Sequence, residues 1–70
     1  MDSRAQEKID EIMYETNEKI NAIVSEIRDI RFSKMNEAEK QRKSDNLREE
    51  FEKVMIEEEK KVEKVMEEYQ

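Results

Sequence analysis

Hydrophobic residues recur along this chain at helical spacings and are separated by charged and polar residues. The clearest sign is a near-repeat of eleven residues: EKIDEIM at 7–13 returns as EKINAIV at 18–24, and EKVM at 52–55 returns at 63–66. Eleven residues make three turns of an α-helix, so the repeat returns the same side chains to one helix face. The pattern predicts that this face is buried against another helix.

The apolar positions form two stripes, one in each half of the chain. Ser3 and Gln6 have the spacing of a capping box, which predicts a helix start near residue 3. Thr16 is the polar member of the first stripe, and Glu58 is the polar member of the second. The predicted protein-interface residues are Ile9, Ile12, Met13, Ile20, Ile23, Val24, Ile27 and Ile30 in the first stripe, and Leu47, Phe51, Val54, Met55, Val62, Val65, Met66 and Tyr69 in the second.

The segment between the stripes, residues 36–46, contains one small apolar residue and decides the fold. In one arrangement the helix continues as a single rod of roughly 105 Å in a long coiled coil, which would place five successive polar residues in its core. In the other, the chain turns at Ser44, Asp45 and Asn46, the residue types that favour helix N-termini. We favour the second: an all-α antiparallel two-helix hairpin, coiled-coil-like, with a helix at about 3–42, a turn at about 43–46 and a helix at about 46–69.

Both stripes are wider than a two-stranded coiled coil needs, because pairs such as Ile12 with Met13 and Val54 with Met55 lie side by side. A single hairpin would leave much of these faces in water. We therefore expect the hairpin to associate into a helical bundle, as a homo-oligomer, with another helical protein, or both. The internal methionines are interpreted as core filling, with an adaptable binding surface as the alternative. Glu58 is interpreted as an edge residue, with a role in fixing the partner's register as the alternative.

Composition argues against catalysis and for association. The 70-residue chain has no Cys and no His, which excludes disulfides, thiol chemistry and imidazole catalysis, and it has no glycine-rich phosphate loop. We expect no cofactor, no metal, no small-molecule substrate and no enzymatic activity. Apolar runs are too short for a membrane span or a signal peptide, so an intracellular, cytoplasmic location is the default expectation.

Charge is unevenly distributed along the chain. The net charge is −6 overall, but residues 28–48 hold seven basic and four acidic side chains, whereas the two flanking segments are acidic. The favoured interpretation is a solvated turn whose basic side chains complement the end of the first helix. The alternative is a contact with a polyanion such as nucleic acid. The residues for that contact are Arg28, Arg31, Lys34, Lys40, Arg42, Lys43 and Arg48.

These patterns predict a non-catalytic oligomerisation and protein-interaction module, such as a small complex subunit, adaptor or scaffold. One alternative is a nucleic-acid-associated regulator that uses segment 28–48. Another is an acidic inhibitor whose glutamate-rich helices imitate the charge of a nucleic acid.

Overall fold

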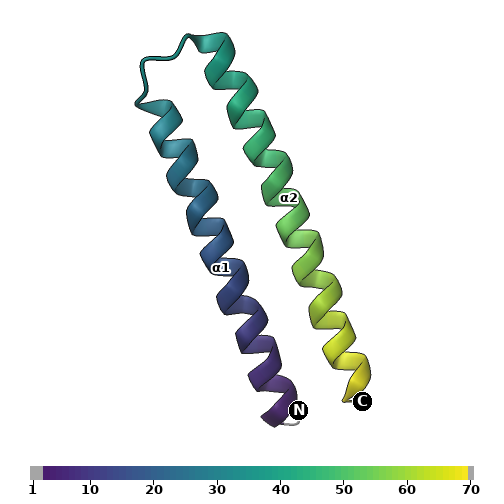
Figure 1. Ribbon diagram of the computed structural model, residues 1–70. Coiled ribbons are helices and arrows are strands. Elements are labelled where there is room, and N and C mark those ends of the chain that lie inside the picture. Colours follow the sequence, from purple (N-terminus) through teal and green to yellow (C-terminus); the bar gives the residue numbers. More distant parts are fainter. Residues whose placement is uncertain (1–2, 70) are drawn as a thin grey trace.

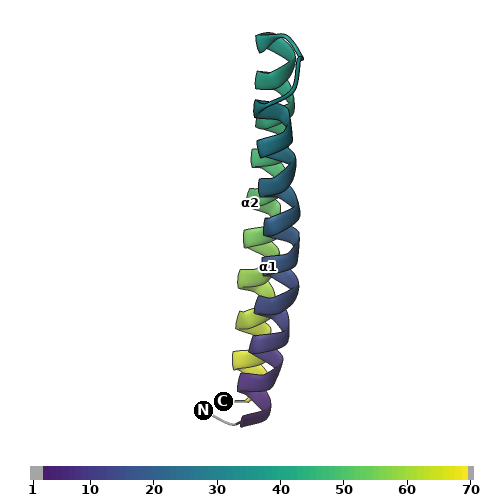
Figure 2. The ribbon, with the colours of Figure 1, turned by 90° about the vertical axis from the view of Figure 1, so that its left-hand side faces the viewer.

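The computed structural model describes residues 3–69, which form two antiparallel α-helices lying side by side (Figure 1). Helix α1 comprises Ser3–Arg31 and helix α2 comprises Glu37–Glu68. The chain is thus the expected all-α hairpin, and the alternative of one continuous rod is wrong. The extents between Cα atoms are 51 × 15 × 10 Å, and Figure 2 shows that the hairpin is a single layer when viewed along its edge.

The turn lies at residues 32–36, about ten residues before the predicted position at 43–46. Asn36 has an extended backbone, and its side-chain oxygen accepts a hydrogen bond of 2.9 Å from the backbone N–H of Glu39. On the other side of the turn, the hydroxyl of Ser33 donates a 2.7 Å hydrogen bond to the carbonyl of Ile30. These bonds satisfy helix-end groups at Ile30 and Glu39. The predicted turn at Ser44–Asn46 is wrong, since those residues lie inside α2.

The two helices meet along a seam that follows the eleven-residue repeat. On α1, the positions that are not exposed are spaced by four, three and four residues, and this pattern then begins again. Because eleven residues in three turns closely match the natural pitch of an α-helix, such a seam runs nearly straight along the helix. The seam consists of Ala5, Ile9, Ile12, Thr16, Ile20, Ile23, Ile27 and Ile30 on α1, and Lys40, Ser44, Leu47, Val54, Glu58, Val62, Val65 and Tyr69 on α2.

The polar members of the two stripes lie at the same level of this seam. Ile9 packs in one buried cluster with Val65. Seven residues further along α1 is Thr16, and seven residues back along the antiparallel α2 is Glu58, so these two side chains share a layer. Thr16 is buried at 6% exposure, whereas Glu58 is half-buried. The expected edge position of Glu58 agrees with this partial burial.

Candidate protein-interaction surface

The two broad sides of the hairpin differ in chemistry, and one ion pair shows which residues belong to each side. Lys8 Nζ lies 3.4 Å from Glu68 Oε2. Lys8 immediately precedes the seam residue Ile9, and Glu68 immediately precedes the seam residue Tyr69. Residues that precede a seam position on either helix therefore share one side of the layer, as the symmetry of antiparallel helices requires.

This first side is charged. Halfway along it, an open groove of about 350 Å³ has Ile23 and Val54 among its lining residues. The other lining residues are mainly charged: Lys19, Glu26, Glu50 and Lys53, together with Ala22. At the open end of the hairpin, Lys8 Nζ lies 5.3 Å from the centre of the Tyr69 ring. Hydrogen bonding to Tyr69, together with the nearby Tyr69 and Glu68 charges, raises the pKa of Lys8 above its usual value.

The opposite side carries the exposed apolar side chains of the two stripes, next to polar and charged residues such as Asn17 and Glu59 that also follow seam positions. Met13 and Val24 immediately follow the seam residues Ile12 and Ile23, and Met55 and Met66 likewise follow Val54 and Val65. Because each of these four residues holds the same position relative to the seam, the antiparallel arrangement places them together on the side away from Lys8 and Glu68. Phe51, four residues before Met55, borders the seam on that side. We call this surface the methionine face; it consists of Met13, Val24, Phe51, Met55 and Met66.

The methionine face is exposed in the single hairpin. Its members retain between 38% and 47% of their accessible surface. Met13, Met55 and Met66 are therefore not core residues of the single hairpin, and their interpretation as core filling of an assembled bundle stays a prediction. The half-buried seam residues Ile20 and Val62 border the face, four residues before Val24 and Met66. The face thus extends the hydrophobic interior of the hairpin outward on one side.

The structure divides the predicted interface residues into two groups. One group lies in the seam and packs within the hairpin: Ile9, Ile12, Ile20, Ile23, Ile27, Ile30, Leu47, Val54, Val62, Val65 and Tyr69. The other group is the methionine face, whose side chains stay partly exposed in the single hairpin. Contact of either group with another chain stays a prediction.

The apolar residues Ala5, Tyr14, Phe32 and Ile56 belong to neither of the two predicted stripes. Ala5 is buried at the open end of the seam, and its position eleven residues before Thr16 was an available signal. Tyr14, Phe32 and Ile56 are exposed outside both stripes. No helical spacing links these three to the stripes, so the sequence held no signal for them beyond their residue types.

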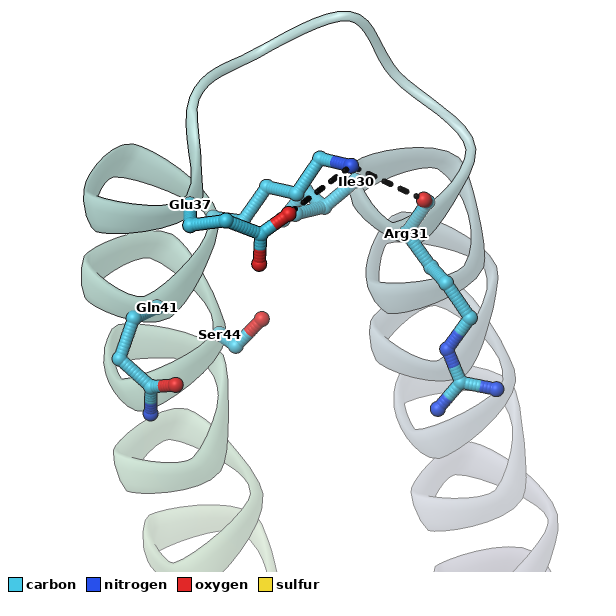
Figure 3. Close-up of a pocket in the computed structure, with 6 residues that line it drawn as sticks. Ile30, Arg31, Glu37, Gln41 and Ser44 are labelled. Carbon is cyan, nitrogen blue, oxygen red and sulfur yellow. Dashed lines mark hydrogen bonds and ion pairs between the residues drawn. The ribbon is translucent and has the colours of Figure 1, made fainter.

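The basic residues surround the turn end without forming one patch. Arg28 and Arg31 lie in the last turn of α1, where positive charge favours the helix dipole. Lys40 reaches across the turn: its Nζ donates a 3.3 Å hydrogen bond to the carbonyl of Arg31 and lies 4.0 Å from Glu37 Oε1 (Figure 3). This contact crosses an open groove of about 260 Å³ that Ile30, Gln41 and Ser44 also line. Lys34 lies in the turn, and Arg42, Lys43 and Arg48 are exposed along α2.

Residues 3–69 contain neither a cluster of metal-binding side chains nor a helix able to span a membrane. No group of three carboxylates in this range is arranged to hold a metal ion. Neither α1 nor α2 carries an apolar stretch long enough to cross a bilayer. A scan against protein-family models finds no match to the chain, and searches of curated proteins and of solved structures likewise find no similar protein.

Proposed function

We propose that this protein is a non-catalytic α-helical interaction module that assembles through its methionine face. The observation that carries the proposal is the position of five exposed apolar side chains on one side of a two-helix layer. Small helical proteins rarely leave such a continuous surface in water, because its burial is the main available source of stability. A patch of a few hundred Å² at about 25 cal/mol per Å² contributes several kcal/mol to association when covered.

The chemistry of the face suits helix packing. Three of its five residues are methionines, whose unbranched side chains adapt to the surface of a neighbouring helix. None of the five residues is charged, in a chain of which 49% is charged, so burying these five side chains takes no charge of their own out of water. Charged residues such as Arg28 and Glu59 lie along the border of the face. Together, these features support a role as a complex subunit or scaffold that presents a helical face to other helices.

The basic segment offers less support for the nucleic-acid alternative. Arg28 and Arg48 follow seam residues, whereas Lys43 precedes one, so the basic residues are divided between the two sides of the hairpin. Lys40 is engaged with the backbone of α1. Specific recognition of a phosphate backbone favours several cations on one surface. Electrophoretic mobility shift with RNA and DNA, at low and at physiological salt, tests this alternative. Absence of a shift at both salt concentrations would remove it.

Sedimentation velocity at micromolar concentrations tests the proposal. We expect the wild-type protein to self-associate and the Met55→Lys variant to shift to a monomer, because the new charge cannot be buried in the interface. Ile56→Lys is the matched control, since Ile56 is equally apolar, exposed and adjacent in sequence but lies outside the face. Circular dichroism establishes that both variants keep their helices. A wild-type protein that remains a folded monomer at all concentrations contradicts self-association.

A further inference from the structure

We infer that a second copy of this chain covers the methionine face, with its turn stacked over the open end of the first hairpin to give an antiparallel four-helix bundle. The inference rests on the proposed function and adds the occupant, the stoichiometry and the orientation. Its two supports are the size of the face and the distribution of charge along the hairpin.

The size of the broad side matches a dimer interface. Between Cα atoms it measures 51 by 15 Å, so a hairpin stacked over all of it covers on the order of 800 Å² on each partner. This is the usual size of a specific protein–protein interface. A second hairpin has the same length, and it carries the same five uncharged side chains of the methionine face. Two copies therefore bury each other's methionine faces and leave both charged sides in water, which is the layering of a four-helix bundle.

Charge selects between the two symmetric ways of stacking the layers. Residues 28–48, at the turn end, carry a net charge of +3, whereas residues 1–27 carry −4 and residues 49–70 carry −5. With both turns at the same end, the positive segments oppose each other. With the turn of one copy over the open end of the other, each positive segment lies near acidic segments. Attraction in the second arrangement and repulsion in the first favour the antiparallel stack.

Two arginines make the difference specific. Arg28 follows the seam residue Ile27, and Arg48 follows Leu47, so both border the turn end of the apolar side. If the turns coincided, α1 of each copy would lie over α2 of the other and bring Arg28 against Arg48 twice. In the antiparallel stack, Arg48 instead faces Glu59 of the second copy, because Arg48 and Glu59 lie at similar distances on either side of the middle of α2 and both follow seam residues. Like charges directly opposed across an interface are strongly disfavoured.

The contact between Arg48 and Glu59 provides a diagnostic residue for the antiparallel stack. Glu59 is the acidic member of this contact and lies on the apolar side, immediately after the seam residue Glu58. We expect Glu59→Gln to weaken the antiparallel dimer severalfold by removing this attraction. With the turns together, Glu59 would lie over α1 near Asn17, and the substitution would leave dimerisation unchanged. An unchanged dissociation constant would therefore count against the orientation.

A distance measurement between the turns tests the orientation directly. The chain has no cysteine, so Lys34→Cys introduces a single site in the turn for a nitroxide label. In the full-length dimer we expect a label separation of about 50 Å by double electron–electron resonance, close to the 51 Å length of the hairpin. A separation below about 20 Å in a dimer would overturn the antiparallel arrangement while leaving the proposed module intact.

Stoichiometry and face are tested by sedimentation equilibrium on the same protein. We expect a dimer whose dissociation constant increases at least tenfold in the Val24→Lys variant. Tyr14→Lys changes an exposed position on the same helix but outside the face, and it should leave the dissociation constant unchanged. A dimer that resists Val24→Lys and yields to Tyr14→Lys would place the interface elsewhere and overturn the inference alone. A folded monomer at every concentration would overturn both the inference and the self-association on which it rests.

Discussion

The ammonium group of Lys8 and the carboxylate of Glu68, sixty residues apart in the chain, lie 3.4 Å from each other at the open end of the hairpin. They join the beginning of α1 to the end of α2, beside the ring of Tyr69. Both side chains are about half exposed, so the pair contributes modestly to stability and responds to salt. Its position shows that residues preceding the seam on both helices share the charged side.

Replacing Lys8 by methionine should lower the melting temperature slightly at neutral pH. Since the pKa of Lys8 is raised in the folded protein, its contribution is present below the usual lysine value of about 10.5 and is lost as the pH rises through the raised pKa. Thermal melts followed by circular dichroism at pH 7 and at a series of higher pH values should show the difference shrinking as the pH rises above the usual lysine value. The difference in melting temperature should also shrink in 1 M NaCl, where the Debye screening length is roughly 3 Å.

Lys60→Met is the control for this measurement. Lys60 is exposed on α2 outside the seam, and removing its charge should not reproduce the dependence on salt and pH. An equal effect of Lys8→Met under all conditions would assign the loss to the side-chain stem and not to the charge.

The position of the turn shows how far local signals determine this fold. Asn36 and Asn46 are each followed by glutamate three residues later, so both have the form of a helix N-terminus. Propensity cannot rank them. The structure uses Asn36, which leaves 32 residues for α2 against 29 for α1, so that the two helices match in length and bury both stripes. Packing between the helices determines which asparagine begins α2, and neither local signal contains information about that packing.

Asn36→Ala should destabilise the hairpin by about 1 kcal/mol, because the backbone N–H of Glu39 loses its hydrogen-bond acceptor. Urea denaturation at a fixed protein concentration measures the change. Asn46→Ala is the matched control: it lies exposed inside α2, where alanine is the better helix former, so it should be neutral or slightly stabilising. If Asn46→Ala destabilised the protein more than Asn36→Ala, the turn would lie at residues 43–46 and not at 32–36.

Lys40→Met should also destabilise the hairpin, by about 1 kcal/mol. The ammonium group donates to the carbonyl of Arg31 at the end of α1, and methionine keeps the apolar stem while removing that donor. Lys43→Met provides a control at an exposed position one turn further along α2. Urea midpoints of the two variants should differ, with Lys40→Met the lower. Equal midpoints would mean that the contact across the turn adds nothing measurable.

The apolar stripes illustrate what periodicity predicts and what it leaves open. The eleven-residue repeat correctly indicated that Ile9, Ile23 and Val65 face another helix. It could not show that the helix belongs to the same chain, nor that neighbouring Met13 and Val24 stay exposed. A stripe about 100° wide covers both positions, and only the direction of the neighbouring helix separates them. The predicted interface therefore combined residues of the hairpin seam with residues of the methionine face.

Glu58→Leu should raise the stability of the protein by about 1 kcal/mol, since a half-buried carboxylate in the Thr16 layer is replaced by an apolar side chain. Urea midpoints at equal protein concentration measure this, because association contributes to apparent stability. Glu57→Leu, adjacent but exposed, controls for helix propensity and should change the midpoint little. A lower midpoint for Glu58→Leu than for Glu57→Leu would show that the carboxylate makes a stabilising contact in this layer, as a residue that fixes the register of the helices does.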